Sequence, residues 1–240
     1  MSTCKNCQNT LSLDANFCEA CGGKIIHNRL TIKNLFLHFV EHFLSYDNKF
    51  LKTFINLFKK PEDVIVSYIT GTRKKYINAI QYFVIALTIT GLEWFIIKKF
   101  FPELMDISAL AQKGKEEIAQ KNVSFVQEYI SIFMMLFVPI YALMSRTVFF
   151  NIKTFNYTEH IVMFMYIIAQ ISIVGAIFNL IGAAFGMSLG TLAFITGPFQ
   201  LIFTAYCLKR LYKLDFLNLI LRTLIFIIVC IVFTIGFTVI

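Results

Sequence analysis

Five long apolar runs occupy most of the chain after residue 76. They cover residues 79–97, 129–149, 160–184, 189–208 and 223–240, and each is close to the roughly 20 mostly apolar residues that a helix needs to cross a bilayer. The chain is 58% hydrophobic and 15% charged, whereas soluble domains average about 45–50% apolar and about 25% charged residues. The sequence therefore predicts an all-α polytopic membrane protein. We expect about five transmembrane helices in residues 77–240 and a polar outer loop at 98–128.

The distribution of Lys and Arg indicates how these helices are oriented. With the N-terminus in the cytosol, the basic residues before the first run and after the second and fourth runs lie inside, as the positive-inside rule requires. The basic residues left outside are Lys98, Lys99, Lys113, Lys115 and Lys121. This pattern predicts a multi-pass protein of the cell inner (cytoplasmic) membrane, with a cytosolic N-terminus and an external C-terminus.

The formal net charge of +8 bears on the choice of partner. Basic residues cluster against the membrane boundaries, such as Arg73, Lys74 and Lys75 before the first run, rather than in a separate basic domain. Such placement is typical of contacts with anionic lipid headgroups. We therefore expect the lipid bilayer as a partner, and we do not expect nucleic acid.

Four cysteines near the N-terminus form two CxxC pairs, Cys4/Cys7 and Cys18/Cys21, with ten residues between them. This spacing is typical of a structural zinc site with four thiolate ligands. A segment as short as 1–25 cannot fold on a hydrophobic core of its own, so metal binding would supply its folding free energy. We expect a zinc ribbon with one structural zinc ion per chain. An iron centre and a redox-active dithiol pair are the alternatives.

Other features of the cysteine pattern agree with a cytosolic N-terminus. Thiolates persist best in a reducing compartment. The remaining cysteines, Cys207 and Cys230, lie within apolar runs and are expected to be small buried thiols. Phe17, directly before the second CxxC pair, is expected to cover the metal site.

Residues 26–76 have the pattern of amphipathic helices rather than of a membrane span. Apolar residues recur at helical spacing in 32–44 and again in 49–58. Pro61 suits the first position of a third, short helix, and Gly71 suits its C-terminal cap. We expect these helices on the cytoplasmic side, either in the headgroup region or packed on the spans.

His38, Glu41 and His42 match the HxxEH pattern of inverted zinc peptidases. Glu159 and His160 open the third apolar run on the same side of the membrane. One hypothesis is that His38, His42 and either Glu159 or His160 form a second metal or proton-sensitive site. In the alternative interpretation, these residues cap helices and lie among lipid headgroups.

Gln170, Asn179 and Gln200 are polar groups inside apolar runs. They either hydrogen-bond to neighbouring helices or line a polar membrane cavity near the bend expected at Pro198. Glu93, which precedes the only tryptophan, is expected at the membrane interface. Both interpretations of the three amides remain open.

Three glycines repeat at four-residue spacing between the third and fourth runs, at Gly182, Gly186 and Gly190. On one helix they would form a groove that allows close helix approach. In a turn they would supply positive φ angles. The sequence alone leaves both possibilities open.

A set of motifs extends from the cysteines to the third apolar run. It comprises Phe17, Cys18, Cys21, Gly22, Pro61, Val64, Tyr68, Gly71, Arg73, Lys74, Tyr76, Glu159 and His160. With these motifs the chain resembles an uncharacterised family of bacterial (Bacteroidetes-type) multi-pass membrane proteins, catalogued as a domain of unknown function. The resemblance implies a cytosolic zinc ribbon followed by a membrane bundle, and it brings no established activity.

No further motif predicts a reaction, because the sequence contains no nucleotide-binding glycine-rich loop, no Ser/His/Asp set and no paired catalytic carboxylates. The leading hypothesis is a non-enzymatic scaffold or sensor whose zinc ribbon binds an unknown cytosolic protein partner. A small transporter or channel that uses Gln170, Asn179 and Gln200 is the alternative. A membrane metalloenzyme ranks third.

Overall fold

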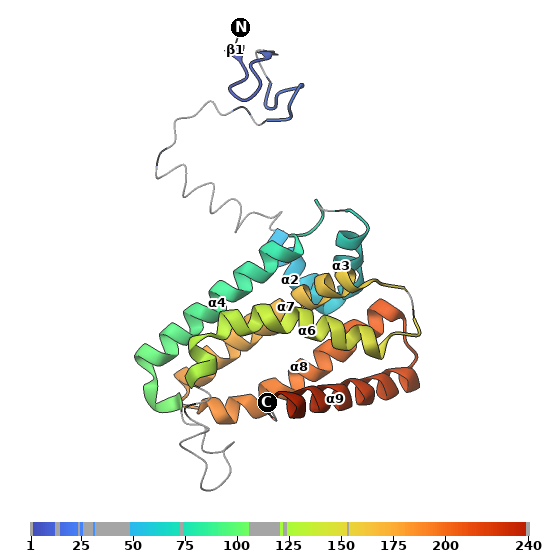
Figure 1. Cartoon of the computed structure of the whole chain (residues 1–240). Helices are drawn as coiled ribbons and strands as arrows, with labels where there is room; N and C mark the ends of the chain where they lie inside the picture. The colour runs from blue at the N-terminus through green and yellow to red at the C-terminus, as the bar shows by residue number, and fades with distance from the viewer. Residues whose placement is uncertain are drawn as a thin grey trace. The chain divides into compact units, whose positions relative to one another are not determined.

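In the computed structural model, the chain divides into two compact units, Met1–Asn48 and Lys49–Ile240 (Figure 1). The structure describes residues 2–12, 15–23, 25, 31, 49–72, 74–105, 121, 124–152 and 154–238. The predicted amphipathic segment 32–44 lies outside the described residues. The first unit holds both CxxC pairs, and the second holds all of the apolar runs.

The N-terminal unit contains a short antiparallel strand pair. Strand β1 (Ser2–Thr3) pairs with β2 (Thr10–Leu11), with Ser2 opposite Leu11 and Thr3 opposite Thr10. The first CxxC pair lies in the loop between these strands. An isolated two-stranded hairpin is marginally stable at best, so a hairpin this short needs another source of stability.

The second unit is built from long helices. Four of them are long and apolar enough to cross a membrane: α4 (Ala79–Phe100), α6 (Ile130–Val148), α7 (Tyr157–Ala184) and α8 (Leu189–Tyr212). They coincide with the first four predicted runs, so the prediction of a helical membrane protein is confirmed for this part of the chain. A short 3-10 helix, η1 (Pro102–Met105), follows α4 in the predicted outer loop.

The fifth run forms helix α9 (Phe216–Thr238), which begins before the predicted start at residue 223. Lys213 caps the C-terminus of α8 with a left-handed φ of 50°. Helix α9 begins three residues later, because its first residues are mostly apolar helix formers. Within the part of α9 whose side chains the structure describes, the apolar stretch is Phe216–Val229, which is shorter than a full span. A fifth membrane crossing therefore stays a prediction.

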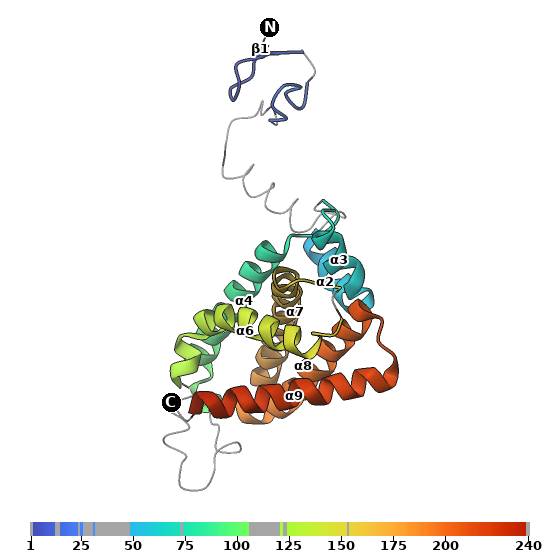
Figure 2. The ribbon, with the colours of Figure 1, turned by 45° about the vertical axis from the view of Figure 1, so that its right-hand side comes forward.

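Helix α7 lies at the centre of the bundle (Figure 2). It packs against α4, α6 and α8, while α9 packs on α6 and α8. In the most apolar stretch of α7, half of the residues are buried (50%), compared with 22–33% in the corresponding stretches of the other three helices. A helix that is apolar on all sides belongs in the interior. The outer helices expose large apolar side chains to the surroundings, as lipid-facing helices do: Phe95, Met135, Phe194 and Ile202.

Helices α2 (Lys49–Lys59) and α3 (Pro61–Ile69) form a collar that packs against α7 and α8. The amphipathic pattern places Leu57 inward, where it is fully buried. The backbone oxygen of Phe54 accepts a hydrogen bond from Gln170 Nε2 at 3.2 Å. The collar is therefore packed on the spans, which is one of the two placements that its sequence pattern allowed.

Two further contacts attach the collar to α8. The hydroxyl of Tyr206 donates to the backbone oxygen of Phe58 at 2.9 Å. The Arg210 guanidinium forms a bidentate pair with the Glu62 carboxylate, with Nη2 at 2.6 Å from Oε1 and Nε at 3.0 Å from Oε2. Planar paired contacts of this kind fix the orientation of both groups, so the start of α3 is held to the end of α8.

Asp63 connects α3 to the segment that leads into α4. Its carboxylate accepts hydrogen bonds from Lys75 Nζ at 2.7 Å and from the Tyr76 hydroxyl at 2.5 Å. Both hydrogen bonds hold the pKa of Asp63 below its ordinary value, and the bond from Lys75 has the larger effect. Burial, together with the Asp63 charge, raises the pKa of Tyr76.

Because the pKa of Asp63 is lowered by folding, its contribution to stability is complete above the unfolded-state pKa of about 3.9 and is lost as pH falls through the folded-state pKa. We expect Asp63→Asn to remove this acid sensitivity and to cost about 1 kcal/mol at pH 7, or roughly 2–4 °C in Tm, since the site is partly exposed and screened. Thermal unfolding in detergent at pH 7 and pH 3 measures both effects. The exposed Glu128 gives the control, Glu128→Gln. Parallel pH profiles for Asp63→Asn and the wild type would contradict the prediction.

A tight turn joins α7 to α8 and decides between the two interpretations of the glycine repeat. Gly186 lies in the turn with φ of 73°, whereas Gly182 lies in the last turn of α7 and Gly190 in the first turn of α8. The glycines therefore do not share one helix face, and the turn interpretation holds for Gly186. Gly182 allows close helix approach, because a Cβ there would lie 2.5 Å from Leu192 Cδ2.

We expect Gly182→Ala to destabilise the bundle by about 1–3 kcal/mol, the usual cost of overpacking. The side chain of Leu192 is buried and has little room to move aside. Gly91→Ala in α4 is the matched control, because a Cβ there meets nothing within 4 Å and alanine favours the helix. Unfolding in detergent measures both variants, and equal stabilities would show that the close approach at Gly182 is unimportant.

Candidate functional site

The four paired cysteines lie together in the N-terminal unit. The sulfur atoms of Cys4, Cys7, Cys18 and Cys21 are all within 4.8 Å of one another. The Cys4–Cys21 sulfur distance is 3.7 Å and the Cys7–Cys18 distance is 3.5 Å. A tetrahedral zinc ion with Zn–S bonds of about 2.3 Å separates its ligands by about 3.8 Å. The spacing fits a tetrahedral metal site, and the four thiolates could hold one metal ion.

Two equivalent backbone loops place these sulfur atoms. Each CxxC pair is followed by a residue with positive φ, Gln8 at 59° and Gly22 at 68°. The Gln8 N–H donates to the Cys4 oxygen, and the Gly22 N–H donates to the Cys18 oxygen, both at 2.8 Å. Positive φ is uncommon outside glycine. The repeated geometry therefore marks two matching loops that direct paired thiolates toward one point.

The sulfur atoms also affect one another's ionisation. A hydrogen bond from the backbone N–H of Gly23 is the main cause that lowers the pKa of Cys21 to about 6. The N–H of Asn9 favours the Cys7 thiolate in the same way, but the neighbouring sulfur atoms of Cys21 and Cys18 raise the pKa of Cys7 to about 12. Four thiolates this close are therefore stable together only with a cation between them.

Phe17 does not cover this site as expected. Its side chain is 58% exposed, and Cys7 and Cys21 are exposed as well. The unit is too small to fold an aromatic ring over the metal ligands while both CxxC loops face solvent. Phe17 instead presents apolar surface beside Cys18.

Glu159 and His160, which the sequence placed in a possible second metal site, are both used within the bundle. The Asn156 side chain accepts from the Glu159 N–H at 2.9 Å, and the Glu159 carboxylate accepts from the Asn156 N–H at 2.6 Å, which forms a capping box. His160 is buried, with Nδ1 at 3.1 Å from Ser145 Oγ and Nε2 at 3.0 Å from the Tyr212 hydroxyl. Glu159 thus caps a helix, in agreement with the alternative interpretation.

His38 and His42, the other residues of that hypothesis, lie outside the described residues. We expect His160→Ala to leave the metal content of the protein unchanged, because both ring nitrogens already have partners. The same variant should lose about 1–3 kcal/mol of stability, since Ser145 and Tyr212 lose a buried partner. Metal analysis and thermal unfolding of one preparation test both outcomes. A fall in metal content would instead support the second site.

The polar residues of the apolar runs separate into two groups, and Gln170 belongs to the first. It is fully buried, and its Oε1 accepts from the hydroxyl of Tyr82 while its Nε2 donates to the Phe54 oxygen. Beside it, the hydroxyl of Tyr166 donates to the Ile77 oxygen at 2.7 Å. Gln170 therefore joins α4, α7 and the collar by hydrogen bonds, and it is not among the residues that line the cavity around Asn179 and Gln200.

Asn179 and Gln200 form the second group, and they line a cavity of about 320 Å³ between α4, α6, α7 and α8. Glu93 lines the same space, which we call the Glu93 cavity. Glu93 is only 3% exposed, and its Oε1 accepts a hydrogen bond from Asn179 Nδ2 at 2.7 Å. The Glu93 carboxylate is therefore buried against the amide on α7, and its expected position at the membrane interface stays a prediction. The sequence signal that could have indicated this cavity is an acidic residue inside an apolar run.

Comparison with known proteins adds one finding. A family model described as "Protein of unknown function (DUF3667)" matches residues 47–91, a segment that contains the collar and the first part of α4. The expected resemblance to a domain of unknown function is confirmed for this segment. No curated protein and no solved structure matches the chain.

The matched segment also explains several residues of the motif set. Val64 is fully buried in the collar, Gly71 ends the turn after α3 with φ of 96°, and Tyr76 bonds to Asp63. These residues thus have structural roles in the collar and in the segment that leads into α4.

Proposed function

We propose that this protein is an integral protein of the cell inner membrane whose N-terminal unit binds one zinc ion and acts as a non-enzymatic scaffold or sensor for a cytosolic protein partner. The observation that carries the proposal is the tetrahedral spacing of the four cysteine sulfur atoms. Sites with four thiolates and no open position are structural rather than catalytic. The exposed ring of Phe17 offers a partner the kind of aromatic side chain that is enriched at interfaces.

The arrangement of charges in the bundle supports a cytosolic N-terminus. Arg210 pairs with Glu62 of the collar, Arg146 lies in the last turn of α6, and Arg222 Nη1 donates to the Val148 oxygen at 2.6 Å. These arginines gather at the end of the bundle where the collar lies. The collar end is therefore the end that the positive-inside rule assigns to the cytosol.

Co-purification tests this function. Full-length protein in detergent is expected to carry one equivalent of zinc together with a cytosolic partner, and a variant lacking residues 1–25 should lose both while its bundle still folds. Phe17→Ala is the more specific variant, because it should retain the zinc ion and weaken binding of the partner. An unchanged set of co-purifying proteins after the deletion would contradict the scaffold or sensor role.

The Glu93 cavity favours a small transporter or channel as a second candidate function. Glu93, Asn179 and Gln200 line one space between the helices, and polar and ionisable groups within membrane helices often mark solute pathways. Vesicles containing the purified protein should then pass a solute, and Glu93→Gln should reduce the flux. Permeability equal to that of protein-free vesicles for every solute tried would count against this candidate.

A further inference from the structure

The Glu93 cavity contains a buried carboxylate without a cationic partner. Glu93 accepts a hydrogen bond from Asn179, and no residue within the described part of the chain forms an ion pair with it. The side chains that line the cavity include no Lys, Arg or His. Ionisable groups buried in a membrane bundle are costly and mark functional sites, because a buried charge requires a partner of opposite sign. The cavity can therefore bind a cationic ligand through Glu93, and it has no basic side chain that would pair with an anionic one.

Thr90 supplies a second, independent observation. Its side chain lines the same cavity and is only 6% exposed, yet its hydroxyl has no hydrogen-bond partner in the described structure. Threonines in helices usually bond back to a carbonyl four residues earlier, as Thr88 does to Val84 in the same helix. Thr90 and Glu93 are three residues apart in α4 and so lie on one face. A buried hydroxyl and a buried carboxylate thus face the same space. Within the described part of the chain, the hydroxyl has no hydrogen-bond partner and the carboxylate has no cationic one, and a ligand could supply both.

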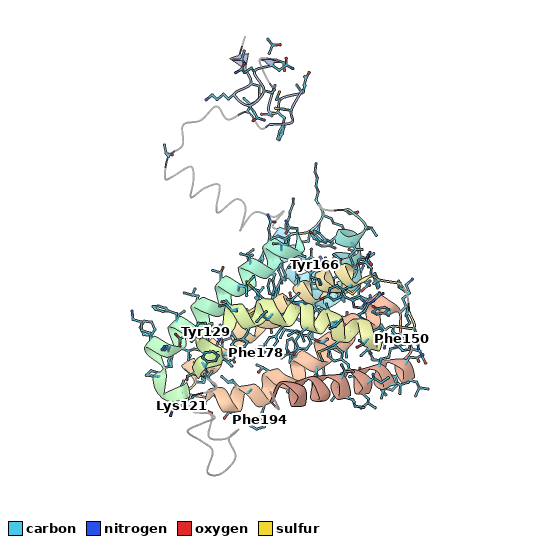
Figure 3. The ribbon with its side chains drawn as sticks, in the orientation of Figure 1. Lys121, Tyr129, Phe150, Tyr166, Phe178 and Phe194 are labelled. Atoms are coloured by element: carbon cyan, nitrogen blue, oxygen red, sulfur yellow. The ribbon has the colours of Figure 1, made fainter. Side chains whose placement is uncertain are left out.

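Apart from the polar side chains of Ser172, Thr196 and Gln200, the rest of the cavity wall is apolar and aromatic. Trp94 from α4, Phe178 from α7 and Phe199 from α8 contribute rings to it, and Phe178 lies toward the end of the bundle away from Tyr166 (Figure 3). The volume of about 320 Å³ is within the roughly 300–1,000 Å³ range of small-molecule sites. An ammonium group on an apolar body satisfies the carboxylate and the rings together, because aromatic faces also attract cations.

We propose that the Glu93 cavity binds a small organic ammonium ion. The ammonium group donates hydrogen bonds to the Glu93 carboxylate and the Thr90 hydroxyl, and Asn179 holds the carboxylate in position. The apolar body of the ligand contacts Trp94 and Phe199. Binding is independent of the metal site and of its partner, and it precedes any passage across the membrane, so it does not require that the protein be a transporter.

The fluorescence of Trp94 provides a direct test, because it is the only tryptophan in the chain and it lines the cavity. Full-length protein in detergent is titrated with 2-phenylethylammonium, with neutral 2-phenylethanol and with anionic 3-phenylpropanoate. We expect a saturable change with the ammonium ion, an affinity about tenfold or more lower for the alcohol, and no saturable change with the anion, since hydrogen bonds to a charged group are the stronger ones.

Three variants locate the site. Glu93→Gln removes the charge but keeps the side-chain size and a partner for Asn179, and it should weaken ammonium binding about tenfold or more while leaving the alcohol unaffected. Thr90→Val keeps the shape and removes the hydroxyl, and it should weaken binding several-fold. Glu128→Gln removes an exposed carboxylate outside the cavity and should change nothing.

Equal affinities of the wild type for the ammonium ion and the alcohol would overturn the proposal, as would unchanged binding in both cavity variants. If Glu93→Gln fails to fold, the titrations of the wild type with the three probes and those of the Thr90→Val variant still test the proposal. Cys18→Ser should leave ammonium binding intact, which separates this proposal from the fate of the metal site. Absence of a saturable Trp94 response to the ammonium ion would also refute it.

Discussion

Replacing Cys18 by serine is expected to abolish metal binding by the N-terminal unit and to unfold it. The Cys18 sulfur is buried and lies 3.5 Å from the Cys7 sulfur, and a serine hydroxyl does not replace a thiolate as a zinc ligand. The two strands beside the site are two residues long, so little else stabilises this unit once the metal is lost. Zinc content should fall from one equivalent per chain to nearly none, as measured by elemental analysis of the detergent-purified protein.

Limited proteolysis of the same samples should show cleavage between residues 2 and 23 only in the variant. Cys207→Ser is the matched control, because Cys207 is buried in α8 and is not part of the four-cysteine cluster. Its zinc content should equal that of the wild type. Stoichiometric zinc in Cys18→Ser would show that the cluster is not the binding site, and iron in the wild type would restore the iron alternative.

Gln170→Leu is expected to destabilise the bundle by about 1–3 kcal/mol. Leucine matches the size of glutamine but leaves the buried Tyr82 hydroxyl without its acceptor, and an unsatisfied buried polar group carries this cost. It also removes the side-chain hydrogen bond to the Phe54 oxygen in the collar. Because these bonds join α4, α7 and the collar, we expect the collar to detach first. Thermal unfolding in detergent and protease sensitivity of residues 49–69 measure the two effects.

A double-mutant cycle separates the hydrogen bond from simple packing. Adding Tyr82→Phe to Gln170→Leu removes the hydroxyl that has lost its acceptor. Replacing both partners of a hydrogen bond by apolar groups often leaves the stability nearly unchanged. The double variant should therefore be more stable than Gln170→Leu alone, and the coupling energy should be about 0.5–2 kcal/mol. Additive losses would mean that Gln170 acts through its volume rather than through its hydrogen bonds.

Element type and order followed from local pattern. The first four apolar runs are helices near the predicted residues, because helix formation in an apolar solvent depends mainly on a sufficient length of apolar side chains. The short helix that begins at Pro61 was predicted for a similar reason, since proline is suited to a first helical position. The proximity of the four cysteines was also predictable, because CxxC spacing brings two thiolates to one metal ion.

The roles of individual polar residues could not be predicted in this way. Gln170, Asn179 and Gln200 looked equivalent in the sequence, yet Gln170 holds the collar while the other two line the Glu93 cavity. The difference arises because the partner of Gln170, the Phe54 oxygen, comes from a segment more than a hundred residues away. Periodicity within one helix carries no information about such a partner.

The amino-acid sequence by itself determined that the chain forms membrane helices, that its collar helices are amphipathic and that four thiolates can meet at one point, because each property depends on neighbours along the chain. Only the tertiary structure decided that Glu93 lies inside the bundle opposite Asn179, that His160 is satisfied by Ser145 and Tyr212, and that the Thr90 hydroxyl is left without a partner. Burial and pairing of these groups depend on how separate helices pack, and packing is a property of the assembled bundle rather than of any one helix.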